Sequence, residues 1–377
     1  MKQPRLLRGT LALLAVFVTV ATGGAQQPAA RWSVERANVW ERETGWLVGA
    51  NYAPASAINQ LEMWQAETWD PRQIDRELGW ARGLGMNTMR VFLHDLAYRQ
   101  DPQGFLDRVD QFLAIADRHG IRPMLVLFDA VWDPFPRLGR QRQPTPGLHN
   151  SGWVQSPGVE IMRDSMRFAE HLEPYVKGVI GRFANDRRVI AWDLFNEPDN
   201  VNGGSYGAFE PANKGELALA LLRRTFAWAR EMNPTQPLTA APWKGDWVDP
   251  SQTAPITTFM LENSDVISFH SYDPLQSMQR LVAALQRYGR PVLCTEYMAR
   301  PRGSTFESIL PFFKEQRVDA YNWGFVSGKS QTIYPWDSWE HEYPAEPPVW
   351  FHDIFRTDGT PYRPGEVELI RALTGGR

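Results

Sequence analysis

Two apolar segments of the sequence each end in a glutamate, and these glutamates together could perform acid–base and nucleophilic chemistry. Residues 189–198 end in Asn196-Glu197-Pro198, and residues 291–297 end in Thr-Glu-Tyr, which contains Glu296. Proline cannot continue a strand ladder, so Glu197 is expected at the carboxyl end of a strand. Two carboxyl groups that face each other across a cleft are the minimum equipment for breaking a glycosidic bond. Taken alone, either glutamate could instead cap an ordinary turn.

The spacing of the two glutamates fits a repeating strand–helix unit. Glu296 follows Glu197 by 99 residues, which is three units of about 33 residues, as expected between the fourth and seventh strands of an eight-stranded barrel. Those two strands stand across the barrel mouth from each other. The spacing therefore predicts that the two carboxyl groups meet over one cleft.

The rest of the chain supplies the elements that such a cleft needs. Short apolar runs alternate with segments of helical periodicity, which requires a parallel sheet with right-handed crossovers. Eight such units, with no Gly-rich phosphate turn after the first run, favour a closed (β/α)8 TIM barrel over an open doubly wound sheet. We expect this α/β fold in a single domain over residues 45–377. The expected strands are 46–51, 87–93, 123–128, 189–195, 237–242, 266–272, 291–297 and 320–326, and the expected helices are 71–84, 105–119, 159–183, 214–232, 275–288 and 305–315.

Two long loops are expected on the face of the barrel where active sites occur. Residues 129–158 follow the third strand and residues 327–348 follow the eighth. Both are rich in aromatic residues, which could pack each loop as a small core of its own or could line a cleft in which sugar rings stack. Four residues in these loops or next to a strand end are candidates for binding substrate: Asp129, Trp132, Trp243 and Trp336.

Further residues at the strand ends add to the two glutamates. Arg90 lies within the second strand, in Met89-Arg90-Val91-Phe92, and Trp323 lies on the eighth. His270 and Tyr272 lie in Ser268-Phe-His-Ser-Tyr272 on the sixth strand, and the two-residue period of a strand points them to one side. An arginine inside a barrel needs a partner, and a carboxylate above it would supply one.

With these residues on the expected strands, the chain resembles the retaining glycoside hydrolases of clan A and is most similar to family 5. The resemblance covers residues 45–373 as a barrel. It implies that Glu296 is the nucleophile, held ionised by Arg90 and Tyr272, and that Glu197 is the acid/base. Burial and the negative charge of Glu296 should raise the pKa of Glu197. The resemblance also implies that Asn196 binds the sugar 2-hydroxyl and that Trp323 forms the floor beneath the reacting ring. His270 and Trp323 could instead be ordinary core residues.

One departure from the family leaves the substrate open. Many members carry a histidine just past the third strand, where this chain has Phe128-Asp129-Ala130. A β-linked, plant-type poly- or oligosaccharide is the expected substrate. If the long loops close one end of the cleft, the enzyme would instead trim terminal residues, with furanosides as a further alternative. A barrel that binds carbohydrate without turning it over is the rival hypothesis from another functional class.

Composition and motifs argue against other functions. The formal net charge is -3 and no run of Lys and Arg occurs, so neither nucleic acid nor an anionic membrane is an expected partner. A single cysteine, Cys294, cannot form an internal disulfide, and the scattered histidines do not indicate a metal. Residues 324–330 resemble the sequence motif of a phosphate-binding loop, but the segment is one residue shorter than the motif requires. We expect carbohydrate as the partner, with no cofactor, no metal and no obligate protein partner.

The first 25 residues have the pattern of a secretory signal peptide. Lys2, Arg5 and Arg8 precede an apolar run over residues 11–20, and the small residues Gly23 and Ala25 follow it. The run is short for a membrane span, although an uncleaved anchor is the alternative. The expectation is a secreted or periplasmic protein, with an N-terminal segment over residues 26–44 before the barrel.

Overall fold

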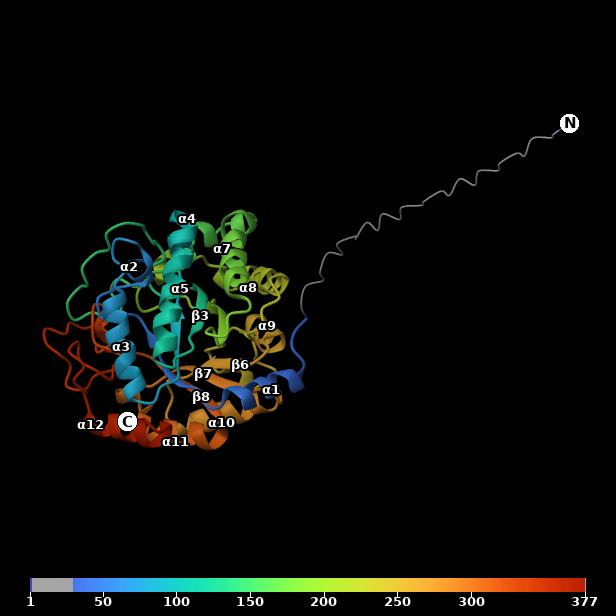
Figure 1. Ribbon diagram of the computed structural model, residues 1–377. Coiled ribbons are helices and arrows are strands. Elements are labelled where there is room, and N and C mark those ends of the chain that lie inside the picture. Colours follow the sequence, from blue (N-terminus) through green and yellow to red (C-terminus); the bar gives the residue numbers. More distant parts are fainter. Residues whose placement is uncertain (2–29, 377) are drawn as a thin grey trace.

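The computed structural model describes Met1 and residues 30–376 and contains an eight-stranded parallel barrel surrounded by helices (Figure 1). The strand order β5-β4-β3-β2-β1-β8-β7-β6 places sequential strands side by side, as a (β/α)8 barrel requires. The expected TIM-barrel fold is therefore confirmed. The strands are β1 (Val48–Tyr52), β2 (Thr88–Phe92), β3 (Met124–Asp129), β4 (Ala191–Asn196), β5 (Leu238–Thr239), β6 (Ile267–His270), β7 (Val292–Tyr297) and β8 (Val318–Asn322).

The seam between β5 and β6 is closed by single hydrogen bonds in place of a regular ladder. The backbone N–H of Asp265 donates to the Leu238 carbonyl at 2.8 Å, and that of His270 donates to the Pro242 carbonyl at 3.0 Å. β5 is only two residues long, against the expected 237–242. Pro237 and Pro242 have no N–H to give to a ladder, which limits regular pairing at both ends of the expected strand.

The helices cover the outside of the barrel (Figure 1) and largely follow the predicted segments. The predicted helix 159–183 is interrupted because the Asp164 carboxylate accepts from the Met166 N–H at 3.0 Å, which starts a separate turn. Several helices were not predicted, among them those over residues 34–44, 60–64, 95–100, 255–263 and 364–374. The helices are α1 (Val34–Thr44), α2 (Gln60–Trp64), α3 (Pro71–Gly83), α4 (Asp95–Gln100), α5 (Pro102–Arg118), α6 (Val159–Met162), α7 (Phe168–Phe183), α8 (Lys214–Glu231), α9 (Pro255–Asn263), α10 (Leu275–Gln286), α11 (Phe306–Gln316) and α12 (Pro364–Thr374), with short 3₁₀ turns η1 (Ser165–Arg167), η2 (Gly207–Phe209), η3 (Asp246–Val248), η4 (Arg300–Arg302) and η5 (Trp336–Trp339).

The eighth strand is shifted toward the N-terminus relative to the prediction of 320–326. β8 ends at Asn322, two residues before Gly324, which has a φ of 77°. This left-handed conformation favours glycine and ends the extended chain. Trp323 therefore lies directly after β8 instead of on it.

The segment before the first strand packs against the barrel. The Arg31 side chain donates to the carbonyl oxygens of Leu261 and Ser264 at 2.7 Å, and the Trp32 N–H donates to Asp265 at 2.8 Å. Trp32 and Ala37 of this segment belong to a buried cluster with Leu293 and other residues from the amino-terminal ends of the strands. The described part of the predicted N-terminal segment is thus continuous with the barrel, and the predicted signal sequence lies outside the described residues.

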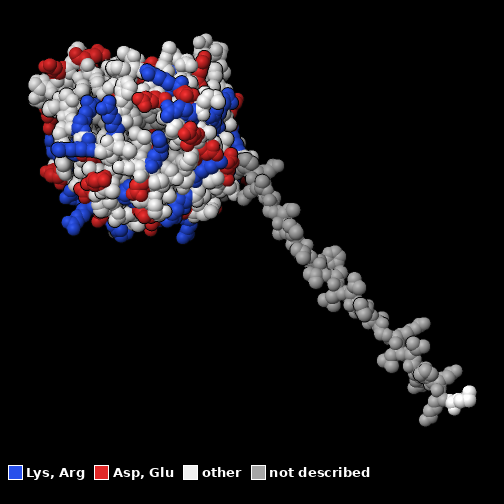
Figure 2. All heavy atoms as spheres, turned by 90° about the horizontal axis from the view of Figure 1, so that it is seen from above, with Lys and Arg blue, Asp and Glu red and all other residues white. Residues whose placement is uncertain are grey.

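Basic and acidic side chains both occur across the face of the molecule shown in Figure 2, in line with the formal net charge of -3. No helix within the described part of the chain is long and apolar enough to cross a membrane.

Candidate active site

The two glutamates predicted from the sequence meet at the carboxyl ends of their strands. Glu197 follows the last residue of β4 directly, and Glu296 lies near the end of β7. Three atoms lie within 4.8 Å of one another: one carboxylate oxygen of Glu197, one of Glu296 and a ring nitrogen of His270. Carboxyl groups about 5 to 5.5 Å apart suit direct attack on a sugar, whereas a larger gap leaves room for water. Glu197 has a φ of 41°, an uncommon backbone conformation that turns its side chain at the strand end.

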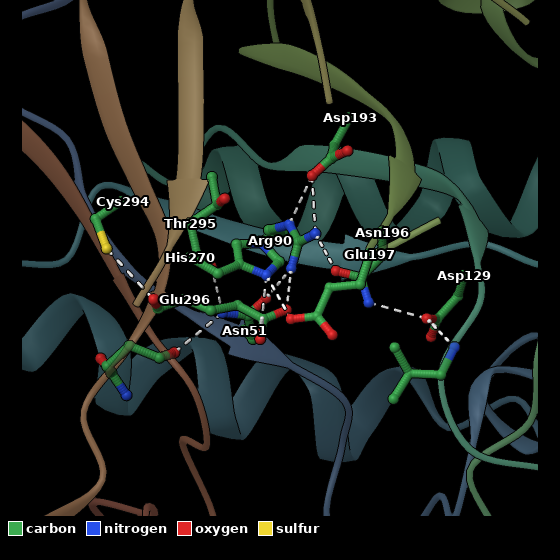
Figure 3. A network of polar contacts seen from close by, with 12 residues as sticks. Asn51, Arg90, Asp129, Asp193, Asn196, Glu197, His270, Cys294, Thr295 and Glu296 are labelled. Atoms are coloured by element: carbon green, nitrogen blue, oxygen red, sulfur yellow. Dashed lines mark hydrogen bonds and ion pairs between the residues drawn. The ribbon is translucent and has the colours of Figure 1, made fainter. Parts of the chain in front are cut away.

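Arg90 of β2 lies between Asp193 and the two glutamates, at the centre of a buried polar network (Figure 3). Its Nη1 donates to Glu296 Oε1 at 2.8 Å and to Asn51 at 2.7 Å. Its Nη2 donates to Asp193 Oδ2 at 2.8 Å and to Asn196 Oδ1 at 2.7 Å. The guanidinium is therefore fully paired, which is the condition under which a charge can be buried.

Glu296 receives donors that favour its ionised form. The Tyr272 hydroxyl donates to Oε2 at 2.7 Å, and Arg90 contacts Oε1. Burial raises the pKa of Glu296, and nearby Glu197 adds to that increase, while His270, Arg90 and Tyr272 lower it. Each oxygen of Glu296 thus faces a donor that stabilises negative charge, although burial of the carboxyl acts against it.

Glu197 lies in a different environment. Its Oε1 is 2.9 Å from His270 Nδ1, and its Oε2 accepts from Asn200 Nδ2 at 2.7 Å. Burial raises the pKa of Glu197 to about 7, opposed by the Asn200 hydrogen bond and by Arg90. The negative charge of Asp199 adds to the increase, and Glu296 lies close enough for its charge to act in the same direction. A carboxyl group with this pKa is partly protonated near neutral pH.

His270 is the neutral neighbour of both glutamates. Burial lowers its pKa to about 4, so the imidazole carries no charge at neutral pH. Its Nδ1 lies 3.6 Å from Glu296 Oε2 as well as close to Glu197. The prediction that His270 and Tyr272 point into one site is confirmed, although Tyr272 lies two residues past the end of β6.

Asp129 supports the site from below. Its carboxylate accepts from Asn196 Nδ2 at 2.9 Å, from Trp153 Nε1 at 2.7 Å and from Gln60 Nε2 at 3.1 Å. Burial raises the pKa of Asp129 to about 6. Asp129 thus holds Asn196 and Trp153 in place, and it also lines the cavity above the two glutamates. The Asn196 side-chain amide has a second Nδ2 proton, which is not donated to Asp129.

A cavity of about 430 Å³ opens above these groups. Volumes of this size are typical of small-molecule sites. The predicted residues Trp132, Trp243, Trp323 and Trp336 all line it, together with Asn196, Glu197, His270, Tyr272 and Glu296. The structure thus brings every predicted site residue to one cavity, with Arg90 beneath its floor.

The group formed by Glu197, His270 and Glu296 is also close enough to share a cation. The Arg90 guanidinium already contacts Glu296, however, and adds positive charge beside the group. Such a charge disfavours a bound cation. Among the described residues, these ligand atoms are better explained as a carboxyl pair with a neutral imidazole.

Several residues of the site were not assigned from the sequence. Asp193 is the second carboxylate partner of Arg90, and Asn51 of β1 contacts the same guanidinium. Asp193 stands in an apolar strand three residues before Asn196, and that position was the available signal. Asn200 and Trp339 line the cavity from loops whose course the sequence does not reveal.

Comparisons with known proteins agree with this geometry. The family model described as Cellulase (glycosyl hydrolase family 5) matches residues 53–339. Mannan endo-1,4-beta-mannosidase A of Emericella nidulans is 27% identical over 93 residues, which covers 25% of this chain and 22% of that protein. A probable mannan endo-1,4-beta-mannosidase A-2 of Aspergillus terreus is 31% identical over 97 residues, covering 26% and 22%. The chain thus spans about a fifth of the length of these curated relatives.

Solved structures with the same fold include an exo-β-1,4-mannosidase of an Opitutaceae bacterium, strain TAV5. Its TM-score is 0.59 at 19% identity, covering 88% of this chain and 60% of that chain. The β-mannanase of the blue mussel Mytilus edulis has a TM-score of 0.54 at 15% identity, covering 78% and 89%. At these identities the likeness concerns the fold alone.

Proposed function

The chain belongs to glycosyl hydrolase family 5, and from this membership and the paired glutamates we propose that it is a retaining glycoside hydrolase acting on β-linked saccharides. Glu296 is the nucleophile and Glu197 the acid/base. The observation that carries this assignment is the unequal environment of the two carboxyl groups. Arg90 and Tyr272 contact Glu296, while the pKa of Glu197 is raised to about 7.

The first half of the reaction forms a glycosyl-enzyme. A carboxylate oxygen of Glu296 attacks the anomeric carbon, and the bond from that carbon to the leaving oxygen breaks. The proton of Glu197 passes to the leaving oxygen, so the departing group leaves as a neutral alcohol. Glu296 becomes a neutral ester.

The second half reverses the role of Glu197. Because Glu296 no longer carries a charge, the pKa of Glu197 falls and its carboxylate accepts a proton from water. The water oxygen bonds to the anomeric carbon, and Glu296 leaves as a carboxylate. Two displacements at one carbon retain its configuration.

Neighbouring residues hold the sugar ring during both steps. The free amide proton of Asn196 suits the 2-hydroxyl, since its other groups are held by Asp129 and Arg90. Trp323 is 9% exposed and lines the cavity, which suits a platform beneath the ring. Asn196 ends β4 and Trp323 follows β8, so the proposed contacts lie on the two strands that flank β1, β2 and β3 in the sheet.

β-1,4-linked mannose is the substrate class that the relatives favour. These relatives include mannan endo-1,4-beta-mannosidases and an exo-β-1,4-mannosidase. A β-glucoside is the second candidate, since a solved β-glucosidase matches with a TM-score of 0.57 at 11% identity. The signal-like pattern of the first 25 residues further supports export, and a secreted or periplasmic protein remains part of the proposal.

A panel of aryl β-glycosides and manno-oligosaccharides tests this function. We expect hydrolysis, with the β-anomer as the first product seen by proton NMR. The α-anomer as first product would overturn the assigned roles. Glycan binding without hydrolysis of any member of the panel would favour the rival hypothesis of a binding protein.

A further inference from the structure

The position of the reacting ring fixes which end of the cleft receives the leaving group. In the proposed complex the ring lies between Asn196 and Trp323, on the side of the barrel that holds β1, β2 and β3. Glu197 protonates the leaving oxygen, so the leaving group extends the other way, past β5 and β6. Trp243 and Lys244 line that side, where Lys244 is exposed. The part of a saccharide on the non-reducing side of the reacting ring would have to continue over β1 and β2.

That side is covered by two loops bonded to each other. We call Gly147–Asn150 and Ser330–Trp339 the loop bridge. The Asn150 N–H donates to the Ser330 carbonyl at 2.9 Å, and the His149 N–H donates to Ser338 Oγ at 3.0 Å. Trp339 Nε1 donates to the His149 carbonyl at 2.9 Å. In the sheet, β1 and β2 lie between β3 and β8, the two strands that these joined loops follow.

The loop bridge is held in place by buried, hydrogen-bonded polar groups. His149 is fully buried, its Nδ1 lies 2.8 Å from the Tyr334 carbonyl, and burial lowers its pKa to about 4. Gln331 accepts from the Gly147 N–H at 3.2 Å and donates to the Leu148 carbonyl at 3.0 Å. Buried and mutually satisfied polar groups of this kind hold one conformation.

Aromatic side chains fill the space beneath the loop bridge. The Trp132 ring stacks on the Trp339 ring with centroids 5.4 Å apart and an angle of 17° between their planes. Trp153 packs edge-on against Trp323 at 6.0 Å and is 4% exposed. A separate cavity of about 20 Å³ lies among Trp153, Trp323 and Phe92. That volume holds about one water molecule and excludes a sugar ring.

We propose that the enzyme is exo-acting and removes one sugar residue at a time from the non-reducing end of its substrate. The loop bridge with Trp132, Trp153 and Trp339 closes the cleft immediately beyond the reacting ring. Only a terminal residue fits there, and its leaving group extends past Trp243. This inference rests on the proposed function and adds its mode of action, in contrast to the endo action named for the curated relatives.

Product analysis of the wild-type enzyme tests the mode of action. A linear β-1,4-manno-oligosaccharide labelled at its reducing end is digested and sampled early. We expect the free monosaccharide and a labelled chain shorter by one residue, and we expect resistance when the 4-hydroxyl of the terminal residue carries a bulky ether. Labelled fragments of all lengths from the first samples would overturn the proposal.

The panel of aryl glycosides keeps this test separate from that of the proposed function. An enzyme that cleaves aryl glycosides but cuts labelled chains internally contradicts the exo mode alone. An enzyme that cleaves neither kind of substrate contradicts the proposed function.

A variant that opens the closed end tests its structural cause. Trp153→Ala should join the small space to the main cavity and raise the proportion of products longer than one residue by about tenfold. Trp69→Ala is the matched control, because Trp69 stacks on Trp64 outside the cavity at 5.5 Å. The control should keep the wild-type products. A folded Trp153→Ala variant, verified by circular dichroism, with an unchanged product pattern would contradict the assignment of this end as the barrier.

Discussion

The guanidinium of Arg90 contacts Glu296 at 2.8 Å, and Arg90 is completely buried. The same guanidinium also contacts Asp193, so one cation serves two carboxylates. Arg90 lowers the pKa of Glu197 as well, but without direct contact. The contact supports the proposed assignment of Glu296 as the nucleophile, since the partner of the arginine is the group better able to carry negative charge.

Replacing the acid/base should affect substrates according to their leaving group. In Glu197→Gln the leaving oxygen receives no proton, so hydrolysis of a β-1,4-linked disaccharide should fall on the order of 10²- to 10⁴-fold. Attack on a dinitrophenyl glycoside, whose leaving group needs no proton, should fall much less. Values of kcat/KM on the two substrates, which report the first displacement, measure this difference, and equal losses on both would exclude Glu197 as the acid.

The activity of the free enzyme should depend on the ionisation of both glutamates. Because the pKa of Glu197 is raised to about 7, kcat/KM should decline above about pH 7 as this acid loses its proton. At low pH it should decline as Glu296 becomes protonated. With a dinitrophenyl glycoside, whose leaving group needs no proton, the alkaline decline should be absent. An alkaline decline of the same size with this substrate would assign it to another group.

The Tyr272 hydroxyl should stabilise the anionic nucleophile. Tyr272→Phe removes the 2.7 Å hydrogen bond to Glu296, which should lower kcat about tenfold or more and move the acidic decline of the pH profile upward. The matched control is Tyr297→Phe, since the Tyr297 hydroxyl is buried with no hydrogen-bond partner among the described residues. An effect of equal size in both variants would indicate a general packing effect.

Burial of Glu197 should also cost stability at high pH. Its pKa is raised from 4.5 to about 7 on folding, so its contribution to stability is fully present below pH 4.5 and is lost as pH rises through 7. Glu197→Gln should therefore increase the free energy of unfolding at pH 8, by at most about 3 kcal/mol, and increase it less at pH 5. Denaturant unfolding at both pH values measures the free energy of unfolding. Glu368→Gln is the control, because Glu368 is an exposed residue of α12. A variant equally destabilised at both values would contradict the linkage.

Much of the site could be predicted from the sequence because it stands on strand ends. Apolar runs identified β4 and β7, and Pro198 marked where β4 stops, so Glu197 and Glu296 were found at the correct edge. Residue type also identified Arg90, since a charged residue within a barrel strand requires a partner. The number of partners was not evident, because Asp193 faces Arg90 only after the barrel closes.

The loop bridge could not be predicted for a different reason. His149 and Ser338 are 189 residues apart and lie in loops without periodicity. Their contact depends on the spatial order of β3 and β8, and on side-chain to backbone bonds that have no sequence pattern. The sequence indicated only that both loops are long, aromatic and on the face of the active site.

Covalent trapping tests the central assignment most directly. A 2-fluoro glycosyl fluoride slows the second displacement and leaves the sugar attached to the nucleophile. Peptide mass spectrometry of the inactivated enzyme should place the sugar on Glu296, and Glu296→Ala should carry no label. A label on Glu197, or on any residue other than Glu296, would contradict the account.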